Sequence, residues 1–414
     1  MAPRAFHVMA KPAGPECNLA CRYCFYLEKA GLYPAAGRFR MSDAVLERFV
    51  RDYIESQDTP EIQFAWQGGE PTLLGVDFFR RVVELQRRFC PPGRKVANAF
   101  QTNGTLLDDE WGQFLKEHGF LVGISVDGPA DMHDHWRVDR GGHPTHGKVM
   151  HGIAVLKRHG VEFNTLTVVH GHNAKRPREV YDFLRRHGSG FMQFIPLVER
   201  ASGGEGLAPP PTLDSSAKAP VTRWSVDPGD YGEFLCAIFD EWVRRDVGKV
   251  FVQLFDVALG VWMNLPASLC VFGETCGAAL VVEHNGDVYA CDHYVYPDWK
   301  LGNLLATPLT ALAGSTRQIA FGDAKRDGLP GQCRSCDVGF ACRGECPKHR
   351  FTRSESGEPG LNYLCPAYRR FFRHADPYMK RMADWLKQGQ PAARIMDDLA
   401  RGRGARGSGP AVRE

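Results

Sequence analysis

The sequence predicts an α/β protein built around a partial barrel of six parallel strands, TIM-like in kind, each strand followed by a helix. Short runs rich in β-branched and aromatic residues recur through the first half of the chain. Amphipathic stretches with a helical period lie between them. This alternation is typical of βα units and a parallel sheet. Ligands of such sheets bind at the carboxyl ends of the strands, so functional residues are expected in the loops that follow them.

The six strands can be placed from these runs. They are expected at residues 6–11, 61–66, 96–101, 120–126, 163–169 and 191–198. A helix is expected over 42–56, with Ser42 or Asp43 as its N-cap, and another over 108–119, ending on Gly119. Residues 199–230 are rich in Gly, Pro and Ser and have no apolar period, which predicts a long loop or linker.

The second half of the chain has a different organisation. A helix is expected over 231–246, and cysteines become dense from 270 to 365. We therefore predict three parts: a barrel (1–230), a cysteine-rich module with a leading helix (231–375), and a C-terminal helix with a disordered tail (376–414). The module is expected to depend on its ligands more than on a large core. The Arg-Gly tail contains too few apolar residues to fold and is interpreted as solvated rather than RNA-binding.

Composition excludes several classes of function. Of 414 residues, 43% are apolar, and 51 Lys and Arg against 48 Asp and Glu leave a net charge of +3, which predicts no nucleic-acid surface. The N-terminal residues do not form a secretory signal, and no apolar stretch is long enough for a membrane span. A cytoplasmic protein is expected. Thirteen cysteines in a reducing compartment favour metal or redox chemistry over disulfides.

Three cysteines occupy the loop after the first strand. Cys17, Cys21 and Cys24 follow the pattern C-x-x-x-C-x-x-C. A zinc site needs a fourth ligand, but the next cysteine is Cys90 and the next histidine is His118. A 4Fe-4S cluster held by three thiolates leaves one iron open for a ligand. A structural metal knuckle is the alternative.

This motif, with Tyr23 before the third cysteine, resembles the signature of the radical S-adenosylmethionine (SAM) enzymes. In that family SAM chelates the open iron and is cleaved to a 5'-deoxyadenosyl radical that removes a hydrogen atom. The sequence Gly68-Gly69-Glu70-Pro71 after the second strand resembles the family's loop for the SAM amino group. The resemblance also implies cofactor contacts, made by the following residues: Tyr23, Gly68, Gly69, Glu70, Ser125, Arg137 and Val198. Neither a Rossmann fingerprint nor a P-loop is present, so nicotinamide or nucleotide-triphosphate chemistry is not supported.

Eight further cysteines resemble the SPASM extension of peptide-modifying radical SAM enzymes. They would hold two auxiliary 4Fe-4S clusters, which makes three clusters in total. The resemblance assigns the first auxiliary cluster to Cys270, Cys276, Cys291 and Cys346, and the second to Cys333, Cys336, Cys342 and Cys365. Two four-thiolate zinc sites are an alternative that spacing alone leaves open. Cys90 and Cys236 are left over and are expected to be small buried hydrophobes.

The whole chain most resembles the anaerobic sulfatase-maturating enzymes, through stretches such as "CNLACRYCFYLEKA", "QGGEPTLL" and "VYACDHYV". These enzymes oxidise one Cys or Ser of a newly made sulfatase, in the motif Cys/Ser-x-Pro/Ala-x-Arg, to Cα-formylglycine. The resemblance implies that Asp292 is the general base, that the substrate is an unfolded or nascent sulfatase, and that a flavodoxin or ferredoxin donates electrons. The alternatives are a peptide-crosslinking radical SAM enzyme, which would share all eleven ligand cysteines, and an electron carrier without catalysis.

Overall fold

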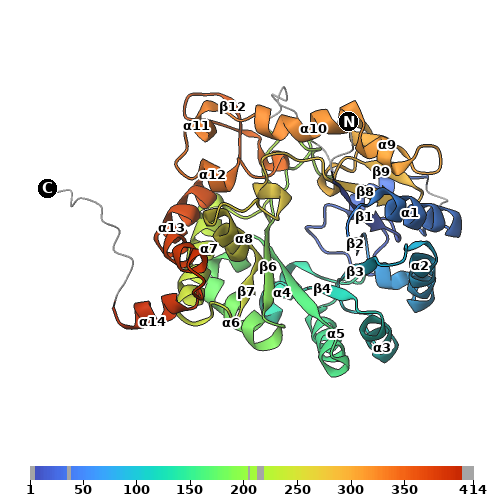
Figure 1. Cartoon of the computed structure of the whole chain (residues 1–414), viewed down its shortest axis with the longest axis horizontal. Coiled ribbons are helices and arrows are strands. Elements are labelled where there is room, and N and C mark those ends of the chain that lie inside the picture. Colours follow the sequence, from blue (N-terminus) through green and yellow to red (C-terminus); the bar gives the residue numbers. More distant parts are fainter. Residues whose placement is uncertain (1–4, 35–38, 204–205, 212–218, 403–414) are drawn as a thin grey trace.

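The computed structural model describes residues 5–34, 39–203, 206–211 and 219–402. Its main sheet is curved into a partial barrel, with helices around the outside (Figure 1). Six neighbouring strands run parallel in chain order, which confirms the predicted barrel. They are β1 (His7–Lys11), β2 (Glu61–Trp66), β3 (Lys95–Thr102), β4 (Leu121–Ser125), β5 (Phe163–Val169) and β6 (Phe191–Pro196).

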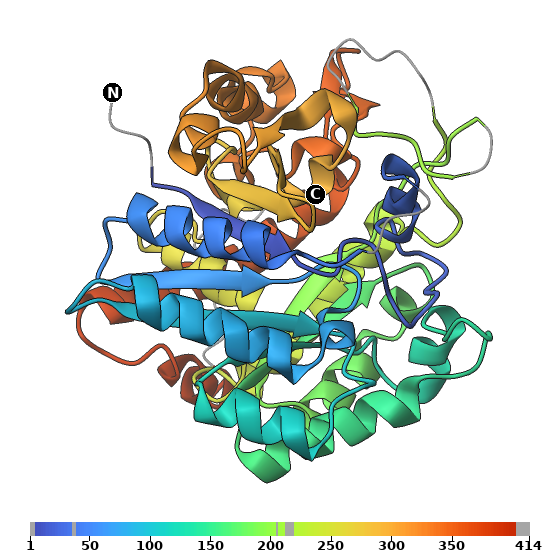
Figure 2. The same cartoon turned by 90° about the vertical axis from the view of Figure 1, so that its right-hand side faces the viewer.

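Four additional strands that the sequence did not reveal extend this sheet at both edges. At one edge β7 (Phe251–Val252) pairs parallel with β6. At the other, β8 (Ala279–Glu283) pairs parallel with β1, and β9 (Asp287–Tyr289) and β10 (Lys300–Asn303) continue antiparallel. The cysteine-rich module is therefore joined to the barrel by a continuous sheet, and Figure 2 shows its yellow and orange segments stacked on the blue strands. A second sheet pairs β11 (Thr352–Arg353) with β12 (Pro359–Leu361).

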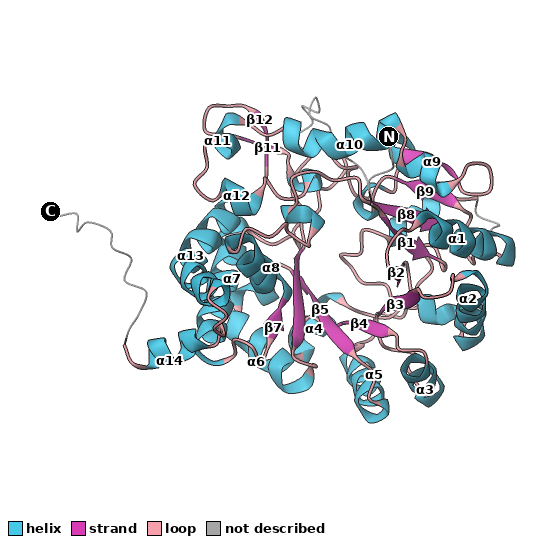
Figure 3. Cartoon of the chain, viewed as in Figure 1, coloured by secondary structure: helices cyan, strands magenta, loops and turns pink. Residues whose placement is uncertain are grey.

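The helices lie outside the sheet and in the module (Figure 3). Those of the barrel are α1 (Asp43–Ser56), α2 (Val76–Phe89), α3 (Asp109–Glu117), α4 (Ala130–Trp136), α5 (His146–His159) and α6 (Pro177–His187). Those that follow are α7 (Pro228–Arg245), α8 (Gln253–Trp262), α9 (Leu309–Ala313), α10 (Thr316–Asp327), α11 (Gly331–Arg334), α12 (Gly339–Cys342), α13 (Cys365–Lys387) and α14 (Arg394–Ala400).

Local side-chain caps explain where the two predicted barrel helices begin. Ser42 is the N-cap of α1, since its hydroxyl accepts a hydrogen bond from the Val45 N–H at 3.4 Å. Asp108 caps α3 by accepting from the Trp111 N–H at 3.0 Å. The chain leaves α3 through Gly119, whose φ of 62° favours glycine.

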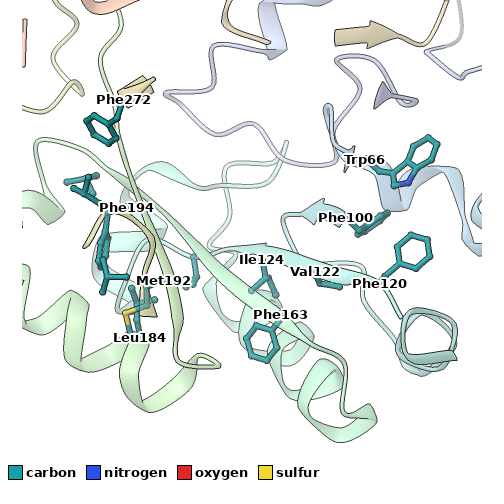
Figure 4. Packing of buried hydrophobic residues seen from close by; sticks show 14 of the residues in the cluster. Trp66, Phe100, Phe120, Val122, Ile124, Phe163, Leu184, Met192, Phe194 and Phe272 are labelled. Carbon is teal, nitrogen blue, oxygen red and sulfur yellow. The ribbon is translucent and has the colours of Figure 1, made fainter. Parts of the chain in front are cut away.

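Successive side chains of each strand point alternately outward, into a core beneath the helices, and inward, into the barrel. Outward-facing side chains such as Trp66, Phe100 and Ile124 are buried beneath the helices (Figure 4). Their inward-facing neighbours are less covered: Gln101 and Gly123 are half-buried, and Ile195 is 40% exposed. These inward-facing positions are therefore partly accessible to solvent.

The second module has a larger apolar core than its sequence indicated. Phe239 of α7, Phe255 of α8 and Phe371 of α13 are fully buried, and their rings pack at centroid distances of 5.3 to 5.9 Å. They belong to the same hydrophobic cluster as the barrel residues. The predicted divisions after residues 230 and 375 fall inside α7 and α13.

The described part of the predicted linker, up to the start of α7, contains isolated bridges but no helix or strand. The Arg-Gly tail lies outside the described residues. No helix in the described ranges combines the length and apolar character needed to cross a membrane.

Candidate active site

The loop that carries the first three cysteines follows β1 and is fastened to the Gly-Gly loop that follows β2. The Gly69 N–H donates to the Gly14 carbonyl at 2.7 Å, and the Glu70 N–H donates to the Glu16 carbonyl at 2.8 Å. A Cβ atom on Gly69 would lie 1.8 Å from the Glu16 oxygen, so only glycine fits. Two motifs that the sequence predicted separately are therefore brought together at one end of the barrel.

Glu70 joins this pair of loops to the end of β3. Its buried carboxylate accepts hydrogen bonds from the Thr72 N–H and hydroxyl, from the Thr102 hydroxyl at 2.7 Å and from the Asn103 N–H at 2.7 Å. Burial raises the pKa of Glu70, although these hydrogen bonds oppose the shift. The Asn103 amide in turn lies 3.7 Å from the Cys17 sulfur. Because the Glu70 carboxylate is engaged within the protein, a cofactor contact from this loop would come from its backbone.

Asp127 connects two of the predicted cofactor residues and was not found from the sequence. Its fully buried carboxylate accepts from the Tyr23 hydroxyl at 2.6 Å and from Arg137 Nε and Nη2 at 2.8 and 3.2 Å. It also accepts from the Val168 N–H at 3.0 Å. Burial is the largest influence on the pKa of Asp127 and would raise it, but the charge and hydrogen bonds of Arg137, together with His170 and His133, hold the pKa below its usual value. The only available signal was a polar residue two positions after the end of a strand.

The other two predicted SAM contacts lie at the ends of β4 and β6, the strands on either side of β5. Ser125 is the last residue of β4 and is 7% exposed. Val198 is buried just beyond β6. Its neighbour Leu197 packs in one small cluster with Tyr23 and Trp136, next to Cys21. Among the described residues, no direct contact joins Ser125 or Val198 to the Gly-Gly loop, so their contacts to SAM stay predictions.

Asp292 lies where the second module meets the barrel. It follows Cys291 at the start of a short 3₁₀ helix after β9, and its carboxylate forms an ion pair with Lys11 at the end of β1. The Lys11 ammonium also lies 3.6 Å from the centre of the Tyr26 ring, in the cysteine loop. Burial is the largest influence on the pKa of Asp292 and would raise it, but the charge and hydrogen bond of Lys11, together with other neighbours, lower the pKa overall. The carboxylate is therefore ionised at neutral pH.

The eight cysteines of the module fall into two groups. All four cysteines assigned to the second auxiliary cluster, Cys333, Cys336, Cys342 and Cys365, line one cavity of about 500 Å³. In the other group, burial raises the pKa of Cys346, and negative charge on Glu345, Cys291 and Cys276 raises it further. The interaction among these thiols is consistent with the assignment of Cys270, Cys276, Cys291 and Cys346 to one cluster.

The donor chemistry of all three groups fits iron-sulfur clusters. Burial raises the pKa of Cys17 and of Cys342 to about 12, so these thiols stay protonated in the metal-free chain and would become thiolates on binding a metal. In the described part of the chain, no three His, Cys, Asp or Glu side chains are set around a single metal ion. Of the two remaining cysteines, Cys236 is buried as expected. Cys90 is only half-buried, because it lies at the exposed C-terminal end of α2, which corrects the expectation.

Comparison with known proteins identifies both modules. Residues 12–184 match the radical SAM superfamily, and residues 270–337 match SPASM, an iron-sulfur cluster-binding domain. A serine-type anaerobic sulfatase-maturating enzyme of Bacteroides thetaiotaomicron is 46% identical over 96% of each chain. A cysteine-type enzyme of Clostridium perfringens is 34% identical over 92% of this chain and 99% of its own.

Comparison with solved structures gives the same family. The structure described as native anSMEcpe with bound AdoMet and Cp18Cys peptide aligns with a TM-score of 0.80 and 34% identity, over 92% of this chain and 99% of that one. The cofactors of this chain are accordingly 4Fe-4S clusters and SAM. The chain belongs to the anaerobic sulfatase-maturating enzymes, a family of radical SAM proteins with a SPASM domain.

Proposed function

We propose that Asp292 is the general base in the oxidation of a sulfatase Ser or Cys side chain to Cα-formylglycine, the reaction of this family. The observation that carries this role is the Lys11–Asp292 ion pair beside the cysteine loop. It supplies an ionised carboxylate where the barrel meets the auxiliary module. A general base must be ionised before it can accept a proton, and the Lys11 charge favours that state.

The reaction removes a hydrogen atom, a proton and an electron from the substrate. When bound, SAM on the first cluster supplies the radical that takes the Cβ hydrogen, and the auxiliary clusters supply an electron acceptor. Asp292 takes the proton from the Ser hydroxyl or the Cys thiol. Serine then gives the aldehyde directly, whereas cysteine gives a thioaldehyde that water hydrolyses with loss of sulfide.

The residues that hold the cofactors follow from the same arrangement. Cys17, Cys21 and Cys24 would bind the SAM cluster, and the Gly68–Glu70 backbone would bind the SAM amino group. The guanidinium of Arg137 directs Nε and Nη2 to Asp127, and Nη1 has no partner among the described residues. That free donor is suited to the SAM carboxylate. Tyr23 in the loop after β1, Ser125 at the end of β4 and Val198 just beyond β6 would complete the site.

We propose serine as the preferred target. The serine-type relative from Bacteroides is 46% identical to this chain, against 34% for the cysteine-type relative from Clostridium. The substrate would be an unfolded or nascent sulfatase. A flavodoxin or ferredoxin would reduce the SAM cluster, and the cytoplasm is the compartment that suits these cofactors.

An anaerobic assay with two matched peptides tests the proposal. Peptides with Ser-x-Pro-x-Arg and Cys-x-Pro-x-Arg are incubated with the loaded enzyme, SAM and reduced flavodoxin, and the products are weighed by mass spectrometry. Loss of two hydrogens from the Ser peptide at the higher rate is expected. Faster oxidation of the Cys peptide would reverse the substrate preference, and a crosslinked product without aldehyde would assign the chain to the rival class of peptide-modifying enzymes. Iron at ~12 atoms per chain, without zinc, checks the three clusters.

A further inference from the structure

Two buried cations lie beside the auxiliary cysteines. Lys325, in the last turn of α10, is fully buried. Arg350, which follows Cys346 by four residues, is 6% exposed. They are neighbours, because Arg350 Nη1 donates to the Lys325 carbonyl at 2.6 Å. Two adjacent positive charges away from water are unfavourable unless negative charge lies nearby.

The hydrogen bonds of Lys325 supply no such charge. Its ammonium donates to the carbonyl oxygens of Cys270 and Val271, at 2.6 and 2.8 Å. Within the described residues it forms no ion pair with a carboxylate. Its polar partners are therefore neutral, and one of them is the backbone of a predicted cluster ligand.

The guanidinium of Arg350 is likewise held by backbone carbonyls alone. Besides Lys325, these are the oxygens of Gly344, Arg343 and Glu345, at 2.8 to 3.2 Å. The nearby Glu345 carboxylate is engaged elsewhere, since it accepts from His349 at 2.9 Å and from Asn362 at 2.7 Å. Arg350 forms no ion pair with it, so the buried positive charge of Arg350 is not neutralised by a side-chain carboxylate in the described chain.

The negative groups that act on both cations are cluster cysteines. Burial lowers the pKa of Lys325, while Cys276, Cys346 and Cys270 pull it back up. Burial also lowers the pKa of Arg350, and Cys333, Cys346 and Cys276 oppose that shift, with a smaller contribution from the Glu345 carboxylate. Lys325 therefore interacts with three of the four ligands of the first auxiliary cluster, and it is hydrogen-bonded to the backbone of one of them, Cys270. Arg350 acts on ligands of both.

We infer that Lys325 and Arg350 are the buried counter-ions of the auxiliary clusters and raise their reduction potentials. A reduced cluster carries one more negative charge than an oxidised one, and a fixed cation in a medium of low dielectric constant stabilises that charge. Lys325 acts mainly on the cluster of Cys270, Cys276, Cys291 and Cys346, and Arg350 acts on both. This inference rests on the proposed function, in which the substrate electron leaves through these clusters, and it assigns the two cations the task of making that transfer favourable.

Redox titration of the loaded protein tests the inference without reference to activity. The titration is followed by electron paramagnetic resonance in a chain with Cys17, Cys21 and Cys24 changed to Ala, so that only the auxiliary clusters respond. Lys325→Met and Arg350→Met remove charge. Lys325→Arg and Arg350→Lys keep the charge but change the hydrogen bonds. Arg326→Met is the matched control, since Arg326 adjoins Lys325 on α10 but is 43% exposed and paired with Asp327.

The expected result is a more negative potential in both Met variants, by at least the ~59 mV that corresponds to a tenfold change in a one-electron equilibrium. Lys325→Met should shift one cluster and Arg350→Met both, while Arg326→Met leaves both unchanged. If a Met variant loses iron, the charge-conserving variants decide the matter, because their potentials should stay at the wild-type values. Unchanged potentials in iron-replete Met variants, or equal shifts in the charge-conserving ones, would overturn the inference. Formylglycine formation by the intact enzyme is measured separately, so the proposed function and the inference about the two cations can be rejected independently.

Discussion

Lys11 and Asp292 form an ion pair between residues that lie almost three hundred positions apart in the chain. The pairing of β8 with β1 makes this contact, because Lys11 lies opposite Glu283 at the end of both strands and the chain returns to Asp292 after β9. The extension of the barrel sheet therefore has a chemical consequence. It delivers a carboxylate from the auxiliary module to the end of the barrel where the cysteine loop lies.

Asp292→Asn should abolish peptide oxidation while some SAM cleavage remains. The variant keeps the shape of the side chain but removes a base, and a general base contributes roughly 10²- to 10⁴-fold to a rate. Formylglycine and 5'-deoxyadenosine are measured in the same reactions. Asp298→Asn is the control, since Asp298 is an exposed residue of the same segment. Normal formylglycine formation by the Asp292→Asn variant would mean that another group is the base.

Asp127→Asn should weaken SAM binding more than peptide binding. Hydrogen bonds to a charged group contribute roughly 1.5–3 kcal/mol, and 1.4 kcal/mol is about a tenfold change in binding. Without the carboxylate, Arg137 and Tyr23 lose the partner that orients both of them. The KM for SAM is expected to rise about tenfold or more, with the KM for peptide within about twofold of the wild-type value.

The control for this variant is Asp134→Asn. Asp134 accepts from the Thr145 and His146 N–H groups at 2.8 Å and supports the start of α5 without contacting Arg137 or Tyr23. It should lower thermal stability and leave the KM for SAM unchanged. Equal effects of the two variants on both KM values would mean that Asp127 is only structural.

The sequence predicted those parts of the fold and the site that depend on residues close together in the chain. The six barrel strands are continuous apolar or alternating runs, and the strand-end loops could be located from them. The cysteine loop was found from its spacing and the Gly-Gly loop from its resemblance to a family motif, and their contact, in which the Glu70 N–H donates to the Glu16 carbonyl, follows from adjacent parallel strands.

The rest of the site depends on contacts between segments far apart in the chain. Strands β7 to β10 are short, and nothing in residues 279–283 shows that they pair with β1. Asp127 precedes Gly128, and Asp-Gly is an ordinary turn signal. Lys11 and Lys325 are residues that sequence patterns place on the surface, yet both are buried at 1% and 0% exposure. Their burial depends on charges that only the folded chain brings together.

Acid should destabilise the protein between about pH 6.5 and pH 4 through His133. Burial lowers the pKa of this ring to about 4, against a usual value of 6.5. Its Nδ1 accepts from the Asp127 N–H at 3.3 Å, and its Nε2 donates to the Thr145 hydroxyl, which itself donates to the Arg137 carbonyl. Protonation of Nδ1 would break the first of these bonds.

The sign of the effect follows from proton binding. Between the two pKa values the unfolded chain binds a proton that the folded chain does not, so stability is full above about pH 6.5 and falls as the pH is lowered. At about 1.4 kcal/mol per pKa unit the loss is roughly 3 kcal/mol. Thermal unfolding of the anaerobic protein is measured from pH 7.5 to 4.5. His133→Asn, which keeps an acceptor near the Nδ1 position but does not titrate, should show a smaller loss over this range. The same pH profile for wild type and variant would exclude His133 as the cause.

Gly69→Ala should prevent the first cluster from assembling while the auxiliary clusters remain. The new Cβ would lie 1.8 Å from the Glu16 oxygen, and backbone atoms of Glu16 and Pro15 leave it no room to move aside. The cysteine loop must therefore be displaced from the Gly-Gly loop, and iron is expected to fall from ~12 to ~8 atoms per chain with loss of SAM cleavage. Gly147→Ala is the matched control: Gly147 lies in α5 with nothing within 4 Å of an added Cβ, and the change should stabilise the helix by roughly 0.5–1 kcal/mol without altering iron content. Full iron content in the Gly69→Ala variant would show that contact between the two loops is not needed to hold the first cluster.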